Sequence, residues 1–159
     1  MNTTKTYGAD GNKFGHTDQD AIERFWRHLL TGAASIRFHR PDSGRGLNDK
    51  AVACLKAARR VESVVPLWTI QPANELLGKR EKNEAYLAAD AGRAYVAYFP
   101  AGGRVTLDLA KVGGRFQIRW VNIDSGQWEA ADQISGGAQA DLSPPGEGND
   151  AATIVLFDG

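Results

Sequence analysis

The sequence predicts a mainly β protein with some α-helix, in which a helix–strand–helix segment precedes an antiparallel β-sandwich or barrel. Between residues 17 and 62, apolar residues recur at three- and four-residue spacing, the period of amphipathic helices. From residue 84 onward, short apolar or alternating runs follow one another at roughly ten-residue spacing. Glycine-containing turns separate them, which is typical of an antiparallel β-domain.

The chain of 159 residues divides into four predicted parts. Residues 1–16 are polar and glycine-rich, show no strand pattern and are expected to form a flexible lead-in. Residues 17–66 hold the helix–strand–helix segment, residues 67–83 form a connector, and residues 84–159 form the β-domain. The large apolar side chains of the connector should pack rather than remain exposed; they are Leu67, Trp68, Ile70, Leu76 and Leu77.

Capping residues place the two helices of the first segment. Thr17 and Asp20 have the spacing of a capping box, and Gly32 is suited to end the first helix. Asn48 is suited to begin the second helix. The apolar face of the first helix must be covered by the β-domain or by a second copy of the chain. That face consists of Ile22, Phe25, Trp26, Leu29 and Leu30.

A short strand is predicted at Ala34–Phe38, between a glycine and a proline. Its neighbours along the chain are helices, so both of its edges lack a partner strand. Unpaired edges attract other strands. We therefore expect self-association, or addition of this strand to the sheet of the β-domain.

The β-domain strands are expected at residues 84–89, 93–100, 104–110, 115–122, 127–134 and 152–157. The alternation is clearest where Phe116, Ile118 and Trp120 interleave with polar residues. Trp120 and Trp128 flank one turn. Two aromatic rings beside a loop can form a sugar-stacking platform, and burial of Trp120 in the core beside a hairpin partner is the alternative.

Composition excludes several functions. Nineteen basic and nineteen acidic residues give a formal net charge of zero, which argues against nucleic acid or a membrane surface as partner. The single Cys54 excludes an internal disulfide and is expected to be a buried, inert thiol. No metal-ligand spacing or cofactor motif occurs, so no metal and no cofactor is predicted. Without a signal-peptide pattern or a long apolar run, the chain as it stands is expected to be cytoplasmic.

The second half carries a specific combination of motifs. It contains "YLAADAGRAYVAYFPAGG", then "VTLDLA", then "RWVNIDSGQW", and finally "PPGEGNDAATIVL". This combination resembles the C-terminal β-domain, classed as collagen-binding, that follows the barrel of apiosidase-like glycoside hydrolases. The stretch before it, "AIERFWRHLLTGAASIRFHRP" and the second helix, is similar to the end of the matching (β/α)₈ barrel.

The resemblance implies that His39 and Arg40 lie at the end of the last barrel strand, on the catalytic face, where they could bind sugar hydroxyls. A loop-anchoring role, with Arg40 bonded to Asp42, is the alternative. The resemblance also implies that the two catalytic carboxylates come from earlier barrel strands. No Glu precedes Glu23, so no catalytic residue is assigned and the chain alone is expected to be inactive.

Three functions remain open at this point. The chain is the non-catalytic C-terminal portion of a glycoside hydrolase, with an auxiliary β-domain that packs on the barrel and contacts carbohydrate. Alternatively it is a stand-alone carbohydrate- or matrix-binding module. The third alternative is one half of a split glycosidase. The expected partners are carbohydrate and either the missing barrel portion or a second copy of the chain.

Overall fold

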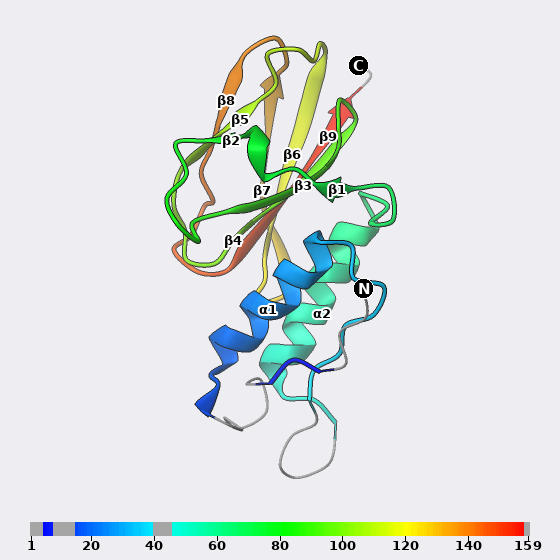
Figure 1. Cartoon of the computed structure of the whole chain (residues 1–159), viewed down its shortest axis with the longest axis vertical. Helices are drawn as coiled ribbons and strands as arrows, with labels where there is room; N and C mark the ends of the chain where they lie inside the picture. The colour runs from blue at the N-terminus through cyan, green and yellow to red at the C-terminus, as the bar shows by residue number, and fades with distance from the viewer. Residues whose placement is uncertain (1–4, 8–14, 40–45, 158–159) are drawn as a thin grey trace.

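The computed structural model describes residues 5–7, 15–39 and 46–157. Within these residues, two helices lie against one face of a β-sandwich (Figure 1). The predicted fold class, an antiparallel β-domain accompanied by a small helical part, is confirmed. Neither helix is long and apolar enough to cross a membrane.

The helices begin at the predicted caps. In front of α1 (Asp18–Leu30), the side chain of Thr17 accepts a hydrogen bond from the Asp20 amide, and the Asp20 carboxylate accepts one from the Thr17 amide. In front of α2 (Asp49–Glu62), the Asn48 side chain accepts a hydrogen bond of 2.8 Å from the Ala51 amide. Gly32 follows the end of α1 with a φ of 73°, as expected for a glycine that ends a helix.

The strands form two antiparallel sheets. The larger sheet has the order β1-β3-β4-β9-β6-β7, and the smaller has the order β2-β5-β8. The six strands predicted for the β-domain are all present, and β1, β2 and β8 are additional. Of the four residues of β8, only Leu142 is buried. The strands are β1 (Gln71–Pro72), β2 (Leu77–Gly78), β3 (Tyr86–Asp90), β4 (Ala94–Phe99), β5 (Val105–Asp108), β6 (Arg115–Asn122), β7 (Gln127–Ser135), β8 (Gln139–Leu142) and β9 (Asp150–Phe157), with a 3₁₀ turn η2 (Asn74–Leu76) between β1 and β2.

The six-stranded sheet is buried on both faces. One face packs against the small sheet, where Tyr95, Phe99 and Ile118 join Leu107 and Leu142 in one apolar core. The other face packs against the helices in a second core. Because successive side chains of a strand point to opposite faces, all six residues of β4 are buried.

The second core covers the apolar face of α1, as predicted. The indole of Trp26 is fully buried and stacks on the ring of Tyr98 from β4, with the ring centroids 5.7 Å apart. Ala88, Val121 and Ala151 of the sheet belong to the same core. The β-domain therefore covers this face around Trp26, while Phe25 packs on Phe38 and Leu29 stays partly buried.

The predicted strand at Ala34–Phe38 is not a regular strand. Phe38 instead forms one parallel bridge with Thr6: the Thr6 amide donates to the Arg37 carbonyl, and the His39 amide donates to the Thr6 carbonyl. Residues 5–7 thus pair with this segment through a single bridge and form no regular strand, as expected; residues 1–4 and 8–14 of the predicted lead-in lie outside the described residues. Addition of Ala34–Phe38 to the sheet of the β-domain was wrong, because Phe38 stacks on Phe25 of α1.

The connector packs as predicted except at one residue. Ile70 is buried, and Leu67, Leu76 and Leu77 pack at the edges of the two cores. The side chain of Trp68 is 76% exposed, so the expectation that it packs was wrong. It lies in the turn between α2 and β1, where hydrogen bonds from Thr69 to the Pro66 carbonyl close the backbone.

The contact between Trp26 and Tyr98 yields a stability prediction. Replacing Trp26 with Ala removes a fully buried indole, so we expect the free energy of unfolding to fall by about 3–5 kcal/mol. Urea denaturation followed by circular dichroism measures this change. The matched control is Trp68→Ala, which removes an exposed indole and should change stability by less than about 0.5 kcal/mol. Equal losses in the two variants would contradict the proposed packing.

Candidate functional site

The parallel bridge brings His39 beside Tyr7. The two rings stack with centroids 4.9 Å apart, each at the residue that follows the bridge. In parallel α/β units, functional side chains lie at this carboxyl end of the strands. His39 thus follows the bridge directly and lies beside Tyr7, which sequence reasoning missed, while its role in binding sugar stays a prediction. Arg40 lies outside the described residues.

Alternation along the two segments separates their side chains into two sets. Thr6 is buried and Phe38 packs on α1, so Lys5, Arg37 and His39 take the opposite side. Lys5, Arg37, Phe38 and His39 line a cavity of about 240 Å³. The cationic side chains of Lys5 and Arg37 and the imidazole of His39 are groups that can donate hydrogen bonds to hydroxyl or anionic groups. None of its described lining residues is a carboxylate.

The two candidate tryptophans do not form a joint platform. Trp120 is 5% exposed and lies in the core between the sheets, its ring 5.6 Å from that of Phe99. Trp128 is opposite Val121 in the register of β6 and β7, so it faces the helix side of the sheet. Trp128 is partly exposed, and the guanidinium of Arg119 lies 4.1 Å from its ring centroid. As a sugar-binding residue, Trp128 stays a prediction.

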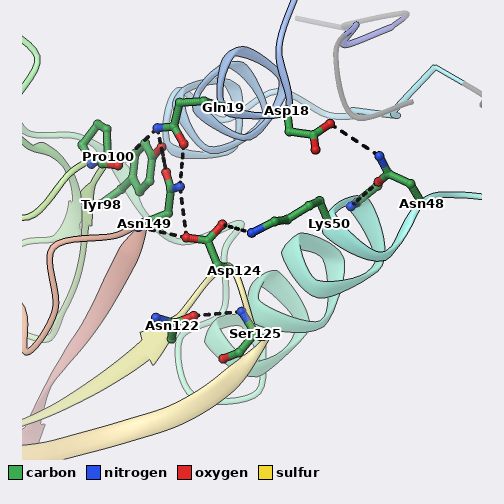
Figure 2. A network of polar contacts seen from close by, with 11 residues as sticks. Asp18, Gln19, Asn48, Lys50, Tyr98, Pro100, Asn122, Asp124, Ser125 and Asn149 are labelled. Carbon is green, nitrogen blue, oxygen red and sulfur yellow. Dashed lines mark hydrogen bonds and ion pairs between the residues drawn. The ribbon is translucent and has the colours of Figure 1, made fainter. Parts of the chain in front are cut away.

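A polar network joins the helices to the sandwich (Figure 2). At its centre the Asn149 and Gln19 amides exchange two hydrogen bonds, of 2.7 and 3.1 Å. The Asn149 oxygen also accepts a hydrogen bond of 3.0 Å from the buried hydroxyl of Tyr98. Asp124 accepts from Asn149 and forms an ion pair of 3.1 Å with Lys50 of α2. Burial alone would raise the pKa of Asp124, but the hydrogen bonds from Lys50 and Asn149 lower it overall.

This network fixes α1 and α2 on the sheet, and α1 in turn carries the bridge with His39. Its members come from two helices, one strand and two loops. No sequence motif links them, which is why sequence reasoning missed the network. Its role is to position the helices, because its polar groups already bond to one another.

Asp150, at the start of β9, differs from the other described carboxyl groups in its burial and in its raised pKa. Its carboxylate is fully buried, and among the described residues neither oxygen has a hydrogen-bond partner of good geometry. Burial raises the pKa of Asp150 to about 6, and the charges of Glu129 and Asp124 raise it further. Asp150 can therefore hold a proton near neutral pH.

The described residues contain no group of three or more His, Cys, Asp or Glu side chains arranged to hold a metal ion. Cys54 is buried in α2, as predicted, and burial raises the pKa of its thiol. A thiol that stays protonated is a poor nucleophile and a poor metal ligand.

The architecture is that of a β-sandwich carrying two helices, with a single parallel bridge between Thr6 and Phe38 beside α1. Residues 72–157 match the family described as "Putative collagen-binding domain of a collagenase". The match covers more than half of the chain, so the chain belongs to this family. The predicted resemblance to the β-domain of this type is thereby confirmed.

Two solved structures share the fold. One is described as a glycoside hydrolase, with a TM-score of 0.71 and 13% identity over 92% of this chain and 38% of that chain. The other is a glycoside hydrolase of family 5 from Bacteroides vulgatus, with a TM-score of 0.73 and 12% identity over 94% of this chain and 40% of that chain. The chain thus spans about two fifths of the length of these structures. No curated protein matches its sequence.

The buried carboxyl of Asp150 predicts a specific pH dependence. Its pKa is raised from 3.8 to about 6 on folding, so its contribution to stability is full below pH 3.8 and is lost as the pH rises through 6. We expect Asp150→Asn to remove this loss and to stabilise the protein by roughly 1–2 kcal/mol at pH 7, with little gain at pH 4. Urea denaturation between pH 4 and pH 8 measures the difference.

Asp141→Asn is the control. The hydrogen bond and ion pair with Arg104 lower the pKa of the exposed Asp141, so its contribution has the opposite sign: it is present above the ordinary pKa and is lost as the pH falls. A gain for Asp150→Asn that is as large at pH 4 as at pH 7 would show that the carboxyl does not titrate in this window.

Proposed function

We propose that this chain is the closing portion of a glycoside-hydrolase-like barrel together with its auxiliary β-domain, and that it is not catalytic by itself. The observation that carries the proposal is the parallel bridge between Thr6 and Phe38 across α1, followed by α2. Two extended segments joined by a parallel bridge, with a helix between them and a second helix after them, have the order of the repeating unit of a (β/α)₈ barrel. The fold shared with two glycoside hydrolases over more than nine tenths of this chain also supports it.

The residues at the strand ends support a non-catalytic role for the chain alone. Retaining and inverting glycosidases both require two carboxyl groups that flank the scissile bond. At the corresponding positions the described residues offer Tyr7 and His39, which can bind a sugar but cannot supply that pair. The carboxyl groups would come from the strands of another barrel segment.

The helices present an apolar surface on which such a segment would pack. A groove of about 210 Å³ runs between α1 and α2, and Leu29, Ile36, Leu55 and Leu67 contribute to its lining. Val52 and Leu55 continue the apolar surface along α2. In a closed barrel, helices that follow successive strands pack against their neighbours on both sides. We propose that this groove packs against the remaining barrel segment, or against a second copy when that segment is absent.

This surface predicts the state of the isolated chain in solution. We expect it to self-associate, and we expect Leu55→Glu to shift it to a monomer, because a charge in the groove opposes burial of the apolar surface. Size-exclusion chromatography with light scattering measures the mass of both proteins. Lys111→Glu, at an exposed position of the β-domain outside the lining of this surface, is the control and should leave self-association unchanged. A chain that is monomeric at high concentration would contradict this part of the proposal.

The second prediction concerns catalysis. The purified chain should release no nitrophenolate from a panel of 4-nitrophenyl glycosides, because the described residues bring no two carboxyl groups together beside Tyr7 and His39. A glycosidase of known activity serves as the positive control. Turnover that copurifies with the folded chain through two different columns would contradict the proposed non-catalytic role.

A further inference from the structure

Two arginines converge on Tyr86, at the junction between α1 and the β-domain. The guanidinium carbon of Arg27, in the last turn of α1, lies 5.1 Å from the ring centroid. That of Arg80, in the loop after β2, lies 5.5 Å away. The ring is held by stacking on Tyr98, at 6.2 Å, and by a hydrogen bond of 2.8 Å from its hydroxyl to Asn83.

Both arginines lack an acidic partner among residues 5–7, 15–39 and 46–157. The ion pairs found there involve Arg59, Arg104 and Lys50, but neither Arg27 nor Arg80. The Nε of Arg80 is buried without a hydrogen-bond acceptor. A buried donor left without an acceptor is unfavourable. The Tyr86 ring attracts the positive charge of the Arg80 guanidinium, but it offers no hydrogen-bond acceptor to the Arg80 Nε.

A cavity lies beside Arg27 and Tyr86; Arg80, on the same ring, does not line it. Its volume is about 160 Å³, and Arg27, Thr31, Asn74 and Tyr86 line it together with Leu30, Pro72 and Leu87. The side-chain oxygen Oδ1 of Asn74 accepts a hydrogen bond of 2.8 Å from the backbone amide of Leu87. This bond fixes the Asn74 side chain and leaves the Nδ2 of Asn74 as a donor. Ligand pockets for drug-sized molecules measure about 300–1,000 Å³. This cavity therefore suits one small group rather than an extended chain.

We propose that this cavity binds an acidic sugar through its anionic oxygen group, a carboxylate or a sulfate ester. Guanidinium groups bind such oxygens with two parallel hydrogen bonds, and an aromatic ring beside them offers an apolar face to the sugar. The anionic part of the proposal stands on Arg27, Arg80 and the cavity. Only the choice of a sugar rests on the proposed function.

The test is titration of the full chain, at low ionic strength, with D-glucuronate, D-glucose 6-sulfate, D-glucose and inorganic sulfate, followed by NMR chemical shifts. We expect the two acidic sugars to bind, their affinity to fall as salt is added, and glucose to bind at least tenfold more weakly. The acidic sugar with the higher affinity identifies the anionic group. Arg27→Gln and Arg80→Gln should each lower this affinity about tenfold.

Arg115→Gln is the matched control, because the Arg115 guanidinium also lies over an aromatic ring, 5.9 Å from the centroid of Phe157, away from the cavity. Its affinity should equal that of the unmodified chain. Circular dichroism of each variant verifies folding. Equal binding of glucose and glucuronate, or an equal loss in Arg115→Gln, would overturn the site. Inorganic sulfate that binds as tightly as both acidic sugars would overturn the choice of a sugar. Neither result affects the groove between α1 and α2, since Arg27 and Arg80 do not line it.

Discussion

Burial of the six-stranded sheet on both faces is the constraint on which the rest of the molecule depends. A sheet that presents apolar side chains on each face needs a cover on each side. The small sheet covers one face. The other carries Tyr98, Val96 and Val121, and only α1 and α2 cover it, with Trp26 stacked on Tyr98 at the centre. The helices are thus part of the core of the β-domain rather than an appendage to it.

Two sets of contacts connect the sheet to the ring pair of Tyr7 and His39. The sheet holds α1 through Trp26 and through the amide pair between Gln19 and Asn149. On its other side, α1 holds Phe38 through Phe25, and Phe38 sets the bridge that brings His39 to Tyr7. If the proposed barrel assembles, the β-domain would support its adjacent end directly, because the same helices would belong to both units.

Patterns within short stretches of sequence predicted the helices and strands, because these depend on residues close together in the chain. The capping box at Thr17 and the alternation around Ile118 decide local structure by themselves, so both helices and the main strands were predicted correctly. Contacts between distant segments have no such signal. Residues 5–7 are too short to show a period, and whether Trp128 shares a face with Trp120 depends on the register between β6 and β7. The cavity lined by Arg27 and Tyr86 likewise requires the packing of α1 on β3.

The net charge of the chain is zero, but its charged side chains are unevenly distributed over the structure. A balanced composition argues against a broad basic surface of the kind that binds nucleic acid. It does not constrain single cavities, because a ligand responds to charges within about a Debye length, some 8–10 Å at moderate salt. Lys5 and Arg37 line one cavity, and Arg27 lines another close to Arg80. Small anionic groups are therefore compatible with a neutral chain, and such a group would gain the most beside Arg27 and Arg80, which have no acidic partner among the described residues.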